Sequence, residues 1–275
     1  MKKLLSSLLA AVCVLASTYA HAQAQGAALD RIKSAGVLRV GVKTDYRPFG
    51  FLDPAGTVVG MEPDLAADLA KRLNVKLELV PVQTANRIEF LQQGRIDAMI
   101  ATMSVNDQRR KVVGVVEPFY YAGGTSLLVR KNAKIKRWED VRDKELCGTQ
   151  GAYYNRPTTQ KYGAKIVAFP GNVEALNALL TGSCIGFVQD STLLAATLAS
   201  GDPKWADFEA PLPVEDLQPW AIAVPLAELN TPYGDFVRQA VIDWHRSGLL
   251  IAQEKKWGLA PTAFLKDAQA KAGAK

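Results

Sequence analysis

The sequence predicts an α/β protein of two lobes, in which helices cover mainly parallel strands. Short apolar runs alternate with stretches of helical periodicity, a pattern typical of helix-covered parallel sheets. The alternation starts near residue 38 and again near residue 145, so that a helix-glycine-strand unit at 90–102 has a counterpart at 178–190. The chain has 275 residues, 48% of them hydrophobic, which is enough for two domains with buried cores.

The first half of the chain contains three strands and two helices by these patterns. Apolar runs predict strands at 38–42, 75–82 and 96–102. Leucines recur at positions 65, 69 and 73, which predicts a helix over 64–73. A shorter helix over 87–93 ends at Gly94.

The second half repeats this order and then returns to the first lobe. Strands are expected at 146–150, 165–169 and 184–189, with a helix over 173–180, and a long amphipathic helical region is expected at 235–257. Two segments can cross between lobes: 118–125, which contains two glycines, and the proline-rich 214–221. We therefore expect residues 25–122 and 222–275 to form lobe 1 and residues 125–216 to form lobe 2, with the ligand in a cleft between them.

The N-terminus has the layout of a secretory signal peptide. Lys2 and Lys3 precede an apolar run over 4–16, which is too short to span a bilayer. Small residues at positions 20 and 22 predict cleavage after Ala22, with Ala24 as the second choice; a membrane anchor is the alternative. We expect a signal peptide over 1–22 and a mature protein in the periplasm.

Charge and cysteine content exclude several classes of function. The formal net charge falls from +6 to +4 once Lys2 and Lys3 are removed, and the cations are scattered, which argues against nucleic-acid binding. Cys147 and Cys184 remain in the mature chain, and in an exported protein they predict one disulfide, with two buried thiols as the alternative. His245 is the only histidine left, so we expect no metal, no cofactor and no hydrolytic Ser/His or Cys/His pair. We also expect a monomer.

Segments along nearly the whole mature chain resemble one family. In this order and spacing they are similar to the periplasmic amino-acid-binding proteins of polar amino-acid ABC transporters, solute-binding protein family 3. The resemblance implies a periplasmic binding protein type II-like fold: two α/β lobes joined by a two-strand hinge, with a ligand cleft between them. It also implies a receptor that captures a polar L-amino acid and delivers it to the membrane permease subunits of an ABC transporter. The segments are 40–51, 60–66, 85–87, 94–98, 104–109, 117–121, 189–190 and 255–259.

An amino acid needs an anion clamp and a cation clamp a short distance apart. The planar fork of Arg109 matches a carboxylate, and the helix-capping residues before it direct backbone amides toward an anion. The resemblance implies that Arg109 binds the ligand α-carboxylate, with Thr102 and Ser104 as donors beside it, and that Asp190 binds the ammonium. The alternatives are a solvated Arg109 and a helix-capping Asp190, and capping is compatible with ligand binding.

The remaining candidates concern the walls of the cleft and the charge of the ligand. The resemblance places Tyr46 against the ligand stem, Met61 where the family usually has phenylalanine, and Tyr153 with its ring in the cleft. Lys43 and Arg87 together favour an acidic ligand, aspartate or glutamate, because two like charges repel unless an anion lies between them. The alternatives are a neutral polar ligand, an outward Lys43, or an Arg87 held by Asp45 or Glu89. The expected ligand-binding residues are Lys43, Tyr46, Met61, Arg87, Ala101, Thr102, Ser104, Arg109, Tyr153 and Asp190.

A second function is possible on the same fold. Cyclohexadienyl dehydratases share this fold class and need a buried acid beside the arginine clamp, for which Glu62 or Glu117 can be nominated. We expect a binding protein rather than an enzyme.

Overall fold

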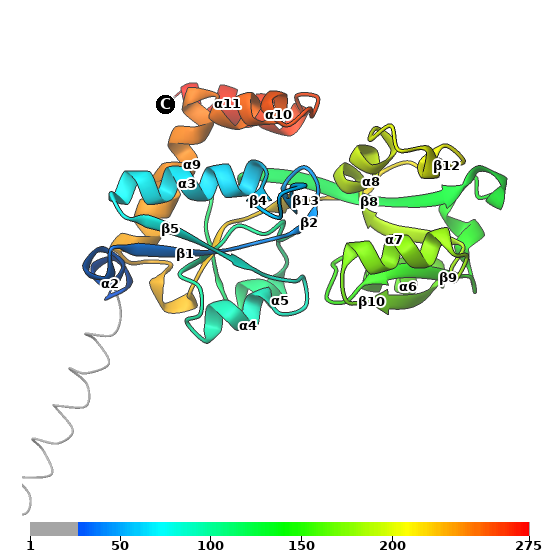
Figure 1. The fold of residues 1–275 in the computed structure, drawn as a ribbon, viewed down its shortest axis with the longest axis horizontal. Coiled ribbons are helices and arrows are strands. Elements are labelled where there is room, and N and C mark those ends of the chain that lie inside the picture. The colour runs from blue at the N-terminus through cyan, green and yellow to red at the C-terminus, as the bar shows by residue number, and fades with distance from the viewer. Residues whose placement is uncertain (1–26, 275) are drawn as a thin grey trace, which may run out of the picture.

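The computed structural model describes residues 27–274, which form two lobes side by side, each built on its own sheet (Figure 1). The predicted α/β fold of two lobes is confirmed. The predicted signal peptide, residues 1–22, lies outside the described residues.

The lobe 1 sheet has the order β5 (Lys76–Pro81), β1 (Val37–Val42), β6 (Ala98–Met99), β14 (Ala223–Val224), β7 (Gly114–Val115). The lobe 2 sheet has the order β10 (Lys165–Phe169), β9 (Glu145–Thr149), β11 (Gly186–Asp190), β8 (Tyr121–Arg130), β12 (Phe208–Glu209), and β13 (Glu215–Trp220) also pairs with β8.

Both sheets repeat one topology. The strands β5-β1-β6 and β10-β9-β11 are parallel, and in each trio the first strand in the chain lies in the middle. An antiparallel strand follows each trio, β14 in lobe 1 and β8 in lobe 2. Leu38, Val40 and Val42 of β1 are fully buried in the core of lobe 1. Ligand sites in such sheets lie at the carboxyl ends of the parallel strands, and these ends face the region between the lobes (Figure 1).

The helices pack around these two sheets (Figure 1). Those of lobe 1 are α2 (Ala27–Ala35), α3 (Met61–Leu73), α4 (Arg87–Gln92), α5 (Asp107–Arg110), η4 (Leu226–Glu228), α9 (Pro232–Ser247), α10 (Leu249–Lys256) and α11 (Ala263–Gly273). Those of lobe 2 are η1 (Lys131–Ala133), η2 (Trp138–Val141), α6 (Asn155–Tyr162), α7 (Asn172–Leu180), α8 (Ser191–Leu198) and η3 (Pro203–Trp205). A small sheet of β2 (Asp45–Tyr46), β3 (Gly50–Leu52) and β4 (Val58–Val59) lies on the lobe 1 side of the cleft.

Several elements differ from the sequence prediction. The helical region 235–257 is two helices, because Gly248 adopts the left-handed φ of 75° between α9 and α10. Helix α3 starts at Met61, three residues before the predicted start. Only Ala98–Met99 of the expected strand 96–102 pairs as a strand, because the chain turns away at Thr102, whose φ is 48°.

Two chain segments connect the lobes. Strand β8 leaves lobe 1 and β13 returns to it, and the two strands pair antiparallel, with Tyr121 opposite Trp220. The ring centroids of Phe49 and Trp220 are 4.9 Å apart, so lobe 1 packs directly on this crossing. The lobe limits 25–122 with 222–275 and 125–216 stay a prediction.

The predicted disulfide is confirmed. Cys147 on β9 bonds to Cys184, and their Cα atoms are 5.6 Å apart. The sequence pattern predicts Cys184 on a strand over 184–189, but the structure places Cys184 two residues before β11. Over residues 27–274, no helix is long and apolar enough to span a membrane, and no cluster of histidine, cysteine and acidic side chains could hold a metal ion.

Candidate ligand-binding cleft

A small cavity lies between the lobes, at the ends of the parallel strands. Only ≈ 10 Å³ of it is open to the centre of a water molecule, about the space that one water needs, so the lobes are closed on each other. The cavity is lined by Tyr46, Thr84, Arg87, Thr102 and Ser104 from lobe 1, and by Ala152, Tyr153, Tyr154 and Gln189 from lobe 2.

Arg109 does not line this cavity, but it bonds to Ser104, which does, and it contacts both lobes. Helix α5 is capped by Asn106, whose side chain accepts a hydrogen bond from the Arg109 amide at 2.8 Å. The guanidinium donates to the Ser104 carbonyl of lobe 1 at 2.7 Å and to the Gly151 carbonyl of lobe 2 at 3.0 Å. Burial lowers the pKa of Arg109 from its usual value. Neighbouring Arg110 is exposed and pairs with Glu117 at 2.8 Å, as expected for a surface residue.

Asp190 ends β11 and caps helix α8, so its carboxylate is fully buried at the lobe 2 wall. Its Oδ1 accepts hydrogen bonds from the Thr192 amide at 2.8 Å and from the Thr192 hydroxyl at 2.6 Å. Its Oδ2 accepts from the Tyr154 hydroxyl at 2.5 Å. Burial raises the pKa of Asp190 to about 6. The side chain therefore caps a helix and still presents a carboxylate to the region between the lobes.

Tyr154 was not predicted from the sequence, which singled out Tyr153. Tyr154 is buried, and its hydroxyl lies 3.5 Å from Ser104 Oγ of lobe 1 in addition to its bond with Asp190. Tyr154 thus connects Asp190, the proposed cation clamp, with Ser104, which also bonds to Arg109, the proposed anion clamp. Its neighbour Tyr153 is half-buried and also lines the cavity. The only sequence signal was the adjacent pair of tyrosines after the first strand of lobe 2.

Arg87 begins helix α4 and is 2% exposed. Its Nη1 donates to the Ala101 carbonyl, whereas its Nε has no hydrogen-bond partner among the described residues. Burial, and after it the nearby charge of Arg109, lower the pKa of Arg87 to about 9. Neither Asp45 nor Glu89 pairs with Arg87, so the alternative in which one of them holds it is not seen.

Lys43 lies behind the cavity rather than on its wall. The side chain is fully buried, and its Nζ forms an ion pair with Asp45 Oδ1 at 2.9 Å and a hydrogen bond with Thr84 Oγ1 at 3.2 Å. Burial lowers the pKa of Lys43, and the pairing with Asp45 opposes that effect. Met61 is also fully buried and is not among the residues that line the cavity.

Glu62 is the buried acid nearest to these cations. Its Oε1 accepts a hydrogen bond from the Thr102 amide at 2.7 Å and one from the Tyr120 hydroxyl, whereas Oε2 has no partner among residues 27–274. Burial raises the pKa of Glu62 to about 7, although Arg87 and Lys43 both favour its charged form. By binding the Thr102 amide, Glu62 supports the left-handed backbone that directs Thr102 to the cavity.

Tyr46 supplies an aromatic wall. Its ring packs edge-on against Trp220 and Phe49, with centroid distances of 5.9 Å to each. Its hydroxyl is buried and has no partner within the described part of the chain. The cavity wall therefore carries two unused hydrogen-bond donors, the Tyr46 hydroxyl and Arg87 Nε.

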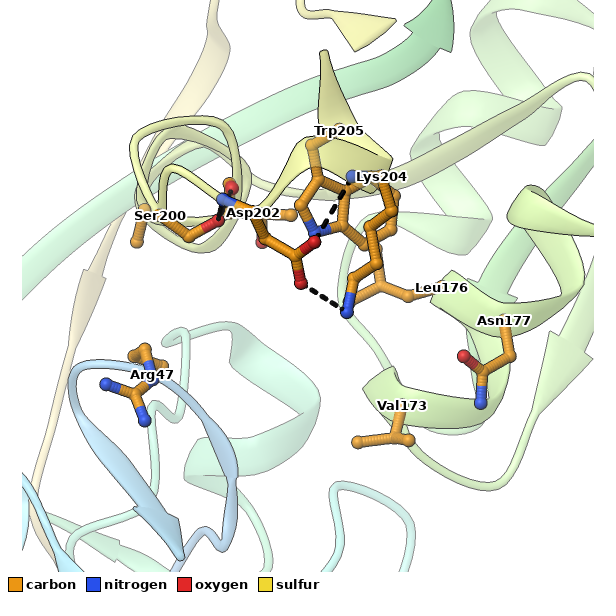
Figure 2. A pocket seen from close by; sticks show the side chains of 10 residues that line it. Arg47, Val173, Leu176, Asn177, Ser200, Asp202, Lys204 and Trp205 are labelled. Atoms are coloured by element: carbon orange, nitrogen blue, oxygen red, sulfur yellow. Dashed lines mark hydrogen bonds and ion pairs between the residues drawn. The ribbon is translucent and has the colours of Figure 1, made fainter. Parts of the chain in front are cut away.

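Larger cavities lie farther out along the contact between the lobes. One of ≈ 460 Å³ separates Arg47 of lobe 1 from Val173 and Asn177 on α7 and from the Asp202–Lys204 ion pair (Figure 2). Another, of ≈ 680 Å³, runs along Arg109 and Tyr153 on the other side. The small inner cavity is lined by residues of both lobes at the ends of the parallel strands, including Ser104 and Tyr154, which contact Arg109 and Asp190, so it is the candidate site.

Curated proteins similar to this chain include amino-acid-binding proteins and one enzyme. The chain is 34% identical over 183 residues to the glutamine-binding protein of Geobacillus stearothermophilus, an alignment of 64% of this chain and 69% of the relative. It is 29% identical to the glutamate/aspartate import solute-binding protein of Salmonella typhimurium, over 72% and 70% of the two chains. It is 30% identical to the cyclohexadienyl dehydratase of Pseudomonas aeruginosa, over 63% and 66%.

The solved structures agree with the fold and the family. A mutant form of ArgBP from T. maritima superposes with a TM-score of 0.77 and 30% identity, covering 84% of this chain and 98% of that one. The family model of the bacterial extracellular solute-binding proteins, family 3, matches residues 38–260. The chain therefore belongs to the family 3 bacterial extracellular solute-binding proteins.

Proposed function

We propose that this protein is a periplasmic receptor that captures a polar L-amino acid by lobe closure and delivers it to an ABC importer. The relatives that bind glutamine or import glutamate and aspartate support this class of ligand. Arg109 would hold the ligand α-carboxylate and Asp190 its ammonium, each from a different lobe. A ligand that bridges them stabilises the closed state, because both ends are satisfied only when the lobes meet.

We infer further that the ligand side chain is acidic, as in glutamate or aspartate. The observation that carries this proposal is Arg87, a buried cation on the cavity wall with an unused Nε donor and no carboxylate paired to it among the described residues. A buried charge without a partner is costly, and a ligand carboxylate would remove that cost. Lys43 adds positive potential from behind, although Asp45 neutralises part of it.

Calorimetric titration with glutamate, aspartate, their amides, arginine and lysine tests both proposals. Glutamate or aspartate should bind more than tenfold tighter than its amide, because the amide leaves the Arg87 charge uncompensated. Arg87→Met should remove that discrimination while the protein still binds the amides. Tighter binding of arginine or lysine than of either acid would refute the acidic ligand, and failure of every amino acid to bind would refute the receptor.

The dehydratase alternative has one observation in its favour. Glu62 is a buried acid with a pKa raised to about 7, which suits proton transfer near neutral pH. Its Oε1, however, already accepts from the Thr102 amide and the Tyr120 hydroxyl, and Glu117 is exposed and paired with Arg110. We therefore favour binding over catalysis. Turnover of prephenate or arogenate by the wild type, absent in Glu62→Gln, would reverse this choice.

A further inference from the structure

Helix α7 of lobe 2 begins at the cleft without a cap of its own. Its N-cap residue is Gly171, which has no side chain to accept the free amides of the first turn. The acceptor comes from the other lobe: Asp45 Oδ2 accepts a hydrogen bond from the Asn172 amide at 2.8 Å. The Asn172 side chain also donates to the Asp45 carbonyl at 3.4 Å. A carboxylate of lobe 1 thus caps a helix of lobe 2, 127 residues along the chain.

The other oxygen of the Asp45 carboxylate, Oδ1, is held by Lys43 of the same lobe. Asp45 Oδ1 forms an ion pair with Lys43 Nζ at 2.9 Å, and the buried Lys43 is fixed by Thr84. This pair orients the carboxylate toward α7, where the positive end of the helix dipole favours an anion. Gly171 leaves room for the approach, because a Cβ at that position would lie 3.0 Å from Asp45 Oδ2.

We propose that Asp45 is a positioning residue that holds the lobes closed by capping helix α7 across the cleft, with Lys43 fixing its carboxylate. The cap exists only while the lobes touch, so it stabilises the closed state relative to the open one. Lys43 then acts through Asp45 rather than by touching the ligand. Closure by Asp45 stands independently of the ligand, whereas its effect on affinity rests on the proposed function.

Distances between the lobes test closure without any ligand. Gln92→Cys on α4 and Gln160→Cys on α6 place fluorophores on exposed sites of opposite lobes, and the native cysteines are protected in their disulfide. Energy transfer in ligand-free single molecules should show the ratio of closed to open molecules reduced about fivefold to tenfold by Asp45→Ala, the loss expected for a helix cap. Asp45→Asn keeps an acceptor oxygen and should lose less.

The matched control is Asp53→Ala, which removes a lobe 1 carboxylate that caps only its own turn, at 2.9 Å from the Ala55 amide and 2.8 Å from the Thr57 amide. This control should leave the closed population unchanged. Equal closed populations in Asp45→Ala and the wild type would overturn the proposal.

A kinetic arm uses L-glutamate and L-glutamine as probes. Asp45→Ala should raise the dissociation rate about fivefold to tenfold, because the closed, liganded state has lost its cap on α7. A slower association with unchanged dissociation would contradict the proposal. Absence of binding in the wild type would refute the proposed function and leave the distance measurement to decide the role of Asp45.

Discussion

Arg109 of lobe 1 and Asp190 of lobe 2 are both charged groups that are at least partly buried. Each is a charged group whose burial disfavours its charge, as the lowered pKa of Arg109 and the raised pKa of Asp190 show. In the closed lobes both are bonded to neutral groups, carbonyl oxygens for Arg109 and hydroxyl and amide donors for Asp190. In the proposed function an amino acid would bring the opposite charge to each of them, so its binding energy would come from groups that the protein itself leaves without counter-ions.

Removing the anion clamp should abolish binding without unfolding the protein. Arg109→Ala is expected to weaken the affinity by roughly 2–5 kcal/mol, the usual cost of leaving one partner of a buried charged pair alone. Titration calorimetry measures the loss and circular dichroism checks the fold. Arg110→Ala is the matched control, since that residue pairs only with Glu117 at the surface. A weakening below threefold for Arg109→Ala would remove it from the site.

The cation clamp should make affinity depend on pH. In the proposed function the ligand ammonium requires the ionised form of Asp190, whose pKa burial raises to about 6 in the free protein. Affinity should therefore be full above about pH 7 and fall as pH drops through 6, approaching tenfold per pH unit below it. Titrations between pH 5 and 8 measure this. Asp190→Asn should bind weakly with a flat profile, and Glu62→Gln should keep the fall below pH 6.

The sequence pointed to some site residues and missed others for a physical reason. Asp190 stands out as a charged residue directly after a predicted strand, and Arg109 as an arginine that follows helix-capping residues; the family resemblance gave both their roles. Tyr154 and Asp45 owe their roles to contacts between the lobes, made with residues 50 and 127 positions away. No local periodicity reports such contacts. From the sequence, Lys43 is expected to reach the ligand, which stays a prediction, and its ion pair with Asp45 became visible only in the fold.

At the scale of elements, strand β8 leaves room for the Asp190 carboxylate because Gly123 has no side chain. Gly123 on β8 lies against the Asp190 carboxylate, and an added Cβ would overlap its oxygens. The glycine is therefore needed for this close approach and not only for hinge freedom. The disulfide between Cys147 and Cys184 anchors the opposite end of β11 beside β9.

Gly123→Ala should damage the site more than the fold. The new methyl group displaces the Asp190 carboxylate, so affinity is expected to fall at least tenfold, alongside an overpacking cost of about 1–3 kcal/mol in stability. The next residue gives a matched control: a Cβ on Gly124 would meet Val214 and Glu215 instead of Asp190. Gly124→Ala should lower the melting temperature yet preserve affinity. Equal losses of affinity in both variants would contradict this role for Gly123.

Elements with strong patterns were predictable, and those held by tertiary contacts were not. Helix α3 and strand β1 followed from leucine spacing and an apolar run. The strands β2 and β4 have two residues each, too few for any alternation to show. Gly248 is typical of a helix end. The sequence nevertheless predicts one helical region over 235–257, because the amphipathic pattern continues past this glycine.

At the scale of the whole molecule, the closed cleft has no room for an amino acid. Its inner cavity fits about one water molecule, and Tyr154, Arg109 and Asp45 each bond across it. A ligand can therefore reach the clamps only after the lobes separate about the two crossing strands. Trp220 of β13 lies at this crossing, fully buried against Tyr46 and Phe49 of lobe 1.

Lobe opening should limit how fast the ligand binds. Because binding follows opening, the observed rate should rise with ligand concentration and then level off at the opening rate, rather than increase without limit. Stopped-flow tryptophan fluorescence can follow this, since Trp220 lies where the lobes move. Asp45→Ala should raise the plateau, because the closed state has lost its cap on α7, whereas Asp53→Ala should not. A strictly linear dependence at all concentrations would mean that the free protein is already open, and that the closed arrangement forms only around the ligand.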